Sequence, residues 1–170
     1  MEEVTVELRR LIDEGVKLNL AEGILFSAGL DTAILAFESL KYGKLKAFTV
    51  AFEDLSLDLP YAKKLSNYLG LEHHVAQLNE EELFKIIPEV VGALKTFDPM
   101  EVRNSIAIHA GLKFAKKHGL GNVMSGDGAD ELFFGYSYLF GMSEEELKQY
   151  SLHLYEHMWF SSIELGKVIG

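Results

Sequence analysis

The sequence contains no cysteine, which excludes disulfides, thiolate zinc sites and cysteine nucleophiles within its 170 residues. It also lacks a surplus of basic residues, since it has 16 lysines and arginines and 26 aspartates and glutamates, which gives a net charge of −10. This balance argues against broad binding to nucleic acid or anionic membranes, so an anionic ligand would need a dedicated site. No apolar run is long enough to span a bilayer, and the charged N-terminus does not resemble a signal peptide. We therefore expect a cytoplasmic protein without membrane or nucleic-acid partners.

Hydrophobic residues make up 48% of the chain and charged residues 25%, as is typical of one soluble domain with a well-filled core. Apolar residues at helical spacing predict a helix over residues 2–18 that lies on an apolar surface. Segments typical of strands follow at residues 22–27, 44–52, 72–78 and 121–125, with helical patterns between them. This alternation predicts an α/β domain with a mainly parallel sheet.

Local signals predict where several helices begin. Asn79 followed three residues later by Glu82 is typical of a capping box. Pro88, further along the same predicted helix, should either kink it or split it in two. Ser143 precedes an acidic first turn and should cap a helix that runs to about Phe160.

The turn "FSAGLDT", residues 26–32, joins a predicted strand to a predicted helix. It lacks both the lysine spacing of a Walker loop and the GxGxxG pattern. One interpretation is a helix cap, because Asp31 and Thr32 are both good N-cap residues. The other is a phosphate site: Gly29 would admit a phosphate to the backbone, Ser27 and Thr32 would supply hydroxyls, and Asp31 would ligate magnesium. Taken alone, the turn leaves both open.

A second turn of small residues, "SGDGADE" at 125–131, follows the fourth predicted strand. Its carboxylates, on Asp127, Asp130 and Glu131, repel one another unless a cation or protons neutralise them. A solvated acidic loop that caps a helix is the alternative. Both turns lie at the carboxyl ends of strands, where open parallel sheets bind ligands.

These residues resemble the synthetase domain of asparagine synthetases and, more broadly, the PP-loop ATP pyrophosphatases. The family loop SGGxDS stands here as "SAGLDTA", and the family motif SGEGSDE with its apolar-Gly-Tyr segment stands as "SGDGADELFFGY". Between them, "FTVAFEDLSLDLPYAKKLSNYLGLEHHV" is similar to the family's strand, acidic loop, helix and LGxxHH segment, in the same order.

The resemblance covers residues 20–160 and implies an adenine nucleotide alpha-hydrolase-like fold, in which helices sandwich a doubly wound, mainly parallel sheet in three layers. Residues 1–19 would form an N-terminal helix packed on this PP-loop domain. Residues 161–170 would begin a truncated or missing C-terminal helical part. The implied activity is AMP-forming activation of a carboxylate, such as aspartate, with release of pyrophosphate and amidation by ammonia or another amine. ATP and Mg²⁺ are the implied cofactors.

The resemblance also implies roles for individual residues. The implied nucleotide-binding residues are Phe26, Ser27, Ala28, Gly29, Leu30, Asp31, Thr32, Val50, Phe52, Ser125 and Gly126. Asp31 and Asp130 would hold magnesium between them. Asp127 takes the position of a family glutamate involved in substrate binding and proton transfer. Arg103 would face the substrate or the phosphates, unless it is a surface or helix-capping arginine.

The sequence departs from the family pattern at four positions in these motifs, of which Thr32 in place of serine keeps the hydroxyl and Ala129 in place of serine removes one. Ala28 replaces a glycine, and its methyl group would be unfavourable if that residue needs a positive φ. Asp127 is one methylene shorter than the family glutamate. These departures leave open a non-catalytic nucleotide-binding or interaction module that retains the fold. Another PP-loop activity, such as adenylation of RNA, is a further alternative, against which the acidic composition argues.

Two other groups are predicted to be structural. His73 and His74 adjoin one another on a predicted strand and therefore point to opposite faces, which favours a structural role over a metal site. The aromatic-rich segment 130–140 should lie in the core, or else form the interface of a homo-oligomer. Trp159 and Phe160 should likewise lie in the core or in a partner contact.

Overall fold

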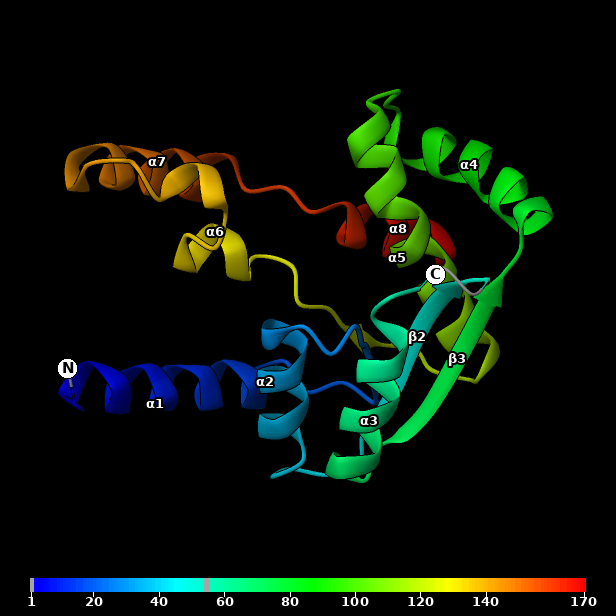
Figure 1. The fold of residues 1–170 in the computed structure, drawn as a ribbon, viewed down its shortest axis with the longest axis horizontal. Coiled ribbons are helices and arrows are strands. Elements are labelled where there is room, and N and C mark those ends of the chain that lie inside the picture. The colour runs from blue at the N-terminus through cyan, green and yellow to red at the C-terminus, as the bar shows by residue number, and fades with distance from the viewer. Residues whose placement is uncertain (1, 54–55) are drawn as a thin grey trace.

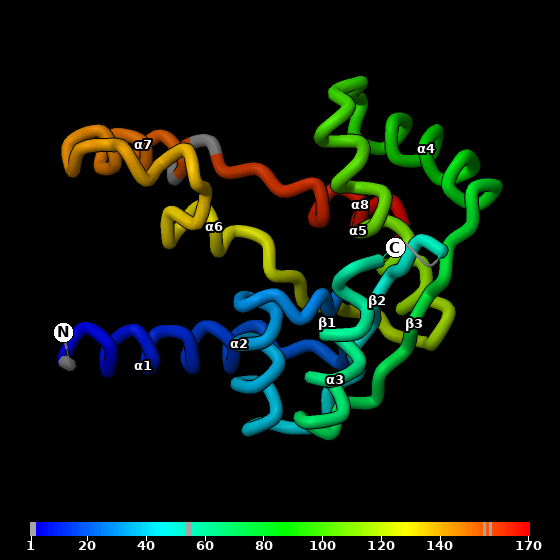
Figure 2. The backbone as a smooth tube through the Cα atoms, in the orientation of Figure 1, coloured from blue at the N-terminus to red at the C-terminus, as the bar shows by residue number. Residues whose placement is uncertain are grey.

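The computed structural model describes residues 2–53 and 56–170, and the chain forms a four-stranded parallel sheet with the strand order β3-β2-β1-β4 (Figures 1 and 2). The strands are β1 (Gly23–Leu25), β2 (Lys46–Phe52), β3 (Glu72–Leu78) and β4 (Val123–Met124). Gly23 in β1 is the register partner of Lys46 in β2 and of Val123 in β4. The two strands that precede the turns are thus neighbours in the sheet.

Helices cover both faces of this sheet. The helices of the described chain are α1 (Glu2–Leu18), α2 (Leu30–Ser39), α3 (Leu59–Leu69), α4 (Glu80–Leu94), α5 (Pro99–Lys117), α6 (Ala129–Phe133), α7 (Glu144–His157) and α8 (Ser161–Ile169), with a short 3₁₀ turn at Ser137–Leu139. On one face, Ile24 and Ala47 pack against α2 and α3. On the other face, Leu25 and Phe48 pack against α5, which in turn contacts α4 and α8. The fold is therefore a three-layer α/β sandwich, as predicted.

A glycine brings α5 close to the sheet. A Cβ atom added to Gly111 would lie 2.8 Å from Cδ2 of Leu25 and 3.4 Å from Cγ2 of Val50. Such a distance is too short for two carbon atoms, so only glycine permits this approach without movement of the neighbours. The close packing holds α5 beside the carboxyl ends of β1 and β2.

The local capping signals are confirmed. The Asn79 side chain accepts a hydrogen bond from the Glu82 backbone and Glu82 reciprocates, so α4 begins with the predicted capping box. Ser143 and Glu146 form a second capping box at α7. Pro88 does not split its helix, because α4 continues through it to Leu94. The predicted strands 22–27 and 121–125 are shorter in the structure, at three and two residues.

Two predictions of burial are wrong. The apolar side chains of α1 do not lie on an apolar surface: Val4 is 72% exposed and only Val16, near the C-terminal end of the helix, is buried. In the aromatic segment 130–140, Leu139 is buried, whereas Phe133 and Phe140 are exposed. Both α1 and the α6–α7 region project away from the sheet (Figure 1), so these side chains extend beyond the layers that form the core.

The acidic connection after β2 includes Asp54 and Leu55, which lie outside the described residues. Among residues 2–53 and 56–170, no helix is long and apolar enough to cross a membrane.

Candidate nucleotide-binding site

The two small-residue turns meet at the point where the chain reverses its direction across the sheet. From β1 the chain proceeds to β2 and then β3 on one side, whereas β4 pairs with β1 on the other. The connections that leave β1 and β4 therefore diverge, which opens a crevice at the carboxyl ends of these two strands. The turns at residues 26–32 and 125–131 line this crevice.

The first turn is organised around the Ser27 side chain. Ser27 Oγ accepts a hydrogen bond from the Gly29 backbone N–H at 3.2 Å and lies 3.2 Å from Thr32 Oγ1. Helix α2 begins at Leu30 with Gly29 as its N-cap residue, so the predicted cap by Asp31 or Thr32 is wrong. Gly29 has no side chain to bond the first N–H groups of α2, and a helix start without a side-chain cap is the kind of position where anions bind.

Ala28 adopts the conformation that makes an alanine unfavourable, with φ at 62°. We expect Ala28→Gly to stabilise the protein by about 0.5–1 kcal/mol, because glycine removes the left-handed strain but adds chain entropy to the unfolded state. Urea unfolding would measure this change. Ala33→Gly in the helical part of α2 is the matched control and should destabilise by about 0.5–1 kcal/mol. Destabilisation by Ala28→Gly would contradict the strain.

A buried set of hydrogen bonds supports the start of this turn from below. The Phe26 carbonyl accepts a hydrogen bond of 2.5 Å from Thr49 Oγ1, and this hydroxyl lies 2.7 Å from His73 Nε2. His73 Nδ1 lies 3.0 Å from the hydroxyl of Ser66, which is fully buried. Burial is the main reason that the pKa of His73 is lowered, and the nearby His74 lowers it further. His73 thus has the predicted structural role, and its contacts fix the strand end that carries the turn.

His74 points to the opposite face, as the strand pattern predicts. Its ring stacks on Phe48, with ring centroids 5.1 Å apart, and its Nε2 lies 2.8 Å from a carboxylate oxygen of Glu72. Both histidines of the LGxxHH segment therefore have partners within the fold.

The second turn contacts the first through Gly126. A Cβ atom on Gly126 would lie 3.0 Å from Cγ2 of Thr32 and 3.5 Å from Cβ of Asp31. A side chain at position 126 would therefore crowd the first turn. Gly128, with φ at 94°, then turns the chain into α6, which carries Asp130 and Glu131.

The negative charge of Asp31 acts on the carboxylate of Asp130. The pKa of Asp130 is raised by partial burial, by the negative charge of Asp31 and by that of Glu131. Two carboxylates that repel in this way are suited to share a cation. In the described part of the chain, no group of three or more acidic or histidine side chains forms a metal site. A Mg²⁺ ion held by Asp31 and Asp130 would take its other ligands from phosphates and water, as is usual for Mg²⁺ in nucleotide sites.

This electrostatic coupling can be measured directly. We expect Asp31→Asn to lower the pKa of Asp130, because the substitution removes one of the negative charges that raise it. Carbon-detected NMR titration of the side-chain carboxyl groups would report the change. Glu131→Gln should act in the same direction, whereas Asp13→Asn on α1 should leave the Asp130 pKa in place. An unchanged Asp130 pKa in Asp31→Asn would show that the two groups do not face one another.

The larger of two adjoining cavities contains most of the predicted nucleotide-binding residues. Its volume is about 370 Å³, and it is lined by both turns, by the ends of β1 and β2 and by α5. The predicted residues that line it are Phe26, Ser27, Gly29, Asp31, Thr32, Val50, Ser125 and Gly126. Ala28, Leu30 and Phe52 are not among its described lining residues. Leu30 is 75% exposed, so its side chain points to solvent.

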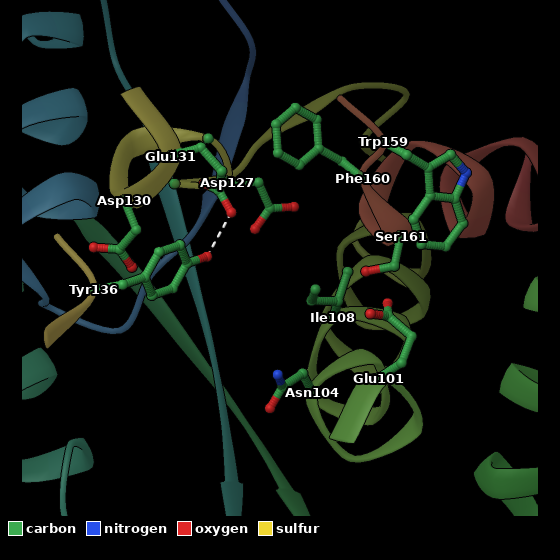
Figure 3. Close-up of a pocket in the computed structure, with 12 residues that line it drawn as sticks. Glu101, Asn104, Ile108, Asp127, Asp130, Glu131, Tyr136, Trp159, Phe160 and Ser161 are labelled. Carbon is green, nitrogen blue, oxygen red and sulfur yellow. Dashed lines mark hydrogen bonds between the residues drawn. The ribbon is translucent and has the colours of Figure 1, made fainter. Parts of the chain in front are cut away.

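The smaller cavity, of about 240 Å³, shares Gly126, Asp127 and Ile108 with the larger one. In Figure 3, Asp127 and Glu131 of the second turn lie on one side together with Tyr136, which follows α6, and residues of α5 and the start of α8 lie opposite. Its remaining lining residues are Glu101, Asn104, Gly128, Asp130, Trp159, Phe160 and Ser161. Four of the lining side chains are carboxylates, and the described lining includes no lysine, arginine or histidine.

The structure adds residues to this cavity that the sequence did not single out. Glu101 and Asn104 come from α5, one turn or less from the predicted Arg103. Arg103 itself is exposed and lines neither cavity in the described part of the chain. Trp159, predicted to be in the core or a partner contact, is half exposed at the cavity wall, and Phe160 packs against Gly128.

Tyr136 closes one side of the smaller cavity. Its hydroxyl donates a hydrogen bond of 2.5 Å to Oε1 of Glu131, shown dashed in Figure 3. This bond, together with burial, raises the pKa of Tyr136 well above its usual value. Tyr136 therefore stays protonated and holds Glu131 in place, and it does not serve as a base at neutral pH.

The fold and the paired turns define an α/β domain of the PP-loop ATP pyrophosphatase type, with its site at the reversal of strand order. More particularly, a family model described as asparagine synthase matches residues 7–162, and the chain belongs to this family.

Individual relatives agree with this assignment. Asparagine synthetase [glutamine-hydrolyzing] from Mus musculus is 34% identical over 176 residues, which cover 96% of this chain and 31% of the relative. The proteins of the same name from Bos taurus and Homo sapiens are 37% and 35% identical over 150 residues, which cover 81% of this chain and 27% of each relative. The chain thus spans less than a third of the length of these relatives.

A solved structure was also found at a greater distance. It is described as a predicted subunit of tRNA methyltransferase from Methanocaldococcus jannaschii, with a TM-score of 0.43 and 17% identity, over 86% of this chain and 72% of that one. A likeness of this degree has no bearing on the function of the present chain.

Proposed function

We propose that this chain binds ATP and uses it to activate a carboxylate as an acyl-adenylate, which ammonia or another amine then converts to an amide. The carboxylate oxygen would attack the α-phosphorus of ATP, with pyrophosphate as the leaving group. Aspartate or a related amino acid is the proposed acceptor. The observation that supports this proposal most strongly is the cavity lined by both family motifs at the end of β1.

The residues of the first turn would bind the leaving pyrophosphate. The Gly29 N-cap and the first N–H groups of α2 provide donors for phosphate oxygens, and the Ser27 and Thr32 hydroxyls lie beside them. Mg²⁺, when bound by Asp31 and Asp130, would neutralise the charge that develops on the departing pyrophosphate. Phe26 and Val50 line the same cavity from β1 and β2 and would flank the adenine.

The smaller cavity would hold the acceptor next to the α-phosphate. Its carboxylates suit the ammonium group of an amino acid, or the amine that attacks the adenylate. Asp127 lines both cavities and is the proposed group for binding the acceptor and accepting a proton. Arg103 lies outside both cavities, and a role for it remains a proposal that depends on the resemblance alone.

Isotope exchange between pyrophosphate and ATP tests the proposal. Formation of an acyl-adenylate is reversible, so labelled pyrophosphate should enter ATP only when an acceptor carboxylate and Mg²⁺ are both present. A panel of amino acids that starts with aspartate would identify the acceptor. Tight ATP binding without exchange for any carboxylate would contradict the enzymatic proposal. That result would favour a nucleotide-binding module without catalysis, which the strained Ala28 in the phosphate turn supports.

A further inference from the structure

A separate cavity lies between α4, α5 and α8. Its volume is about 790 Å³, larger than either cavity of the candidate site. The lining combines apolar groups with charged ones: Pro88, Glu89, Gly92, Ala93, Lys95, His109, Lys113, Lys116, Lys117, Val168 and Ile169. We refer to it as the basic groove.

The groove concentrates positive charge in an acidic protein. Four of the 16 basic side chains line it, against one carboxylate, although the net charge of the chain is −10. Lys113 forms an ion pair of 2.7 Å with Glu89, and Lys116 donates to the Ile169 carbonyl. The side-chain ammonium groups of Lys95 and Lys117 have no hydrogen bond or ion pair within residues 2–53 and 56–170. Two lysine charges therefore face the groove without a counter-charge.

A buried histidine in the groove wall lacks one of its two partners. His109 is 3% exposed, and its Nε2 lies 2.7 Å from Glu89. Lys113 and His109 lower the pKa of Glu89, so this carboxylate is ionised and accepts the Nε2 proton. Nδ1 is buried and has no hydrogen-bond partner among the described residues. In the neutral ring this nitrogen is an acceptor, and a buried acceptor without a donor is unusual in a folded protein.

Lys95 occupies a position where helices usually place glycine. It is the C-cap residue of α4, with φ at 56° and ψ at 33°. Glycine is favoured there because a side chain is strained in the left-handed conformation. A lysine in such a conformation at the edge of a groove is compatible with a use of its charge for binding. The other explanation for a lysine at a helix end is interaction with the helix dipole, and the Lys95→Gly variant distinguishes this structural role from ligand binding.

We propose that the basic groove binds a small organic anion, such as a dicarboxylate, that also carries a hydroxyl or amino donor. Lys95 and Lys117 pair with the acidic groups, the apolar side chains of Pro88, Val168 and Ile169 contact the hydrocarbon part, and a small shift of the groove wall exposes Nδ1 of His109 to the donor group. The groove is distinct from the two cavities of the candidate site, with which it shares no lining residue.

Calorimetric titration of the full chain with malate and succinate tests this proposal. These acids differ by one hydroxyl, so malate should bind more tightly if it donates to His109. Lys117→Ala should weaken malate binding by about fivefold, which corresponds to one partly exposed ion pair. Lys64→Ala on α3 is the matched control and should leave binding unchanged, and so should Asp31→Asn, which affects only the candidate nucleotide site.

Lys95→Gly separates ligand binding from a structural role. We expect this variant to raise the melting temperature of the free protein, since glycine relieves the left-handed strain, and to weaken malate binding by about fivefold. Malate binding that survives both lysine substitutions would overturn the proposal, as would the absence of binding or its loss in Asp31→Asn. Equal affinities for malate and succinate would show that His109 does not meet the donor group.

Discussion

Carboxylate-dependent exchange of pyrophosphate into ATP should fall by about 10²- to 10³-fold in Asp31→Asn, the size of effect seen when one stabilising group is removed from a transition state. The substitution preserves shape but removes one of the two carboxylates that fit magnesium. The loss should therefore appear in kcat, together with a higher requirement for Mg²⁺. Asp130→Asn should reproduce it.

The control for this prediction is Asp13→Asn, which makes the same chemical change on α1, where Asp13 pairs with Lys41 and Tyr42. Its exchange activity should match that of the unmodified protein. If Asp31→Asn kept more than about a tenth of the activity, magnesium would have to be held by other groups.

Gly135→Ala should reduce exchange by about 10²-fold, although Gly135 lines neither cavity. An added Cβ atom would lie 1.9 Å from Oδ1 of Asp130, so this carboxylate has to leave its position. The clash falls mainly on the flexible end of a side chain, and the melting temperature should change little. The loss should therefore be one of activity and Mg²⁺ affinity.

Gly141→Ala is the matched control, because nothing lies within 4 Å of a Cβ atom at that glycine. It should retain both activity and stability. Full activity in Gly135→Ala would show that the position of the Asp130 carboxylate does not matter, and would count against its role as a magnesium ligand. A large drop in melting temperature would instead show that the backbone of α6 had moved.

The sequence predicts best what depends on neighbouring residues. The capping boxes at Asn79 and Ser143, and the order of strands and helices, follow from local patterns and are confirmed. The placement of both turns beside one crevice also follows from the sequence, because parallel strands end at a common edge. The sequence predicts strain at Ala28 only if this residue has a positive φ. The backbone angle that decides this is known only from the structure.

Features that depend on distant parts of the chain were missed. Apolar spacing in α1 predicts an apolar face but not whether another element covers it, and Val4 is exposed. The sequence favours the core over an oligomer interface for the aromatic residues of segment 130–140, and most of them are exposed, which contradicts the core interpretation. The hydrogen bonds among Phe26, Thr49 and His73 join three strand positions far apart in sequence, and no local signal identifies them.

Two consecutive residues of helix α5 line the candidate site and the basic groove. Ile108 lines both cavities of the site, and His109 lines the groove. If an anion in the groove changes the affinity for ATP by some factor, thermodynamic linkage requires that ATP change the affinity for the anion by the same factor. Helix α5 contacts the sheet closely at Gly111, so it would be the element through which such coupling passes. Titration of either ligand in the presence of the other would therefore give one coupling free energy, measurable from both directions.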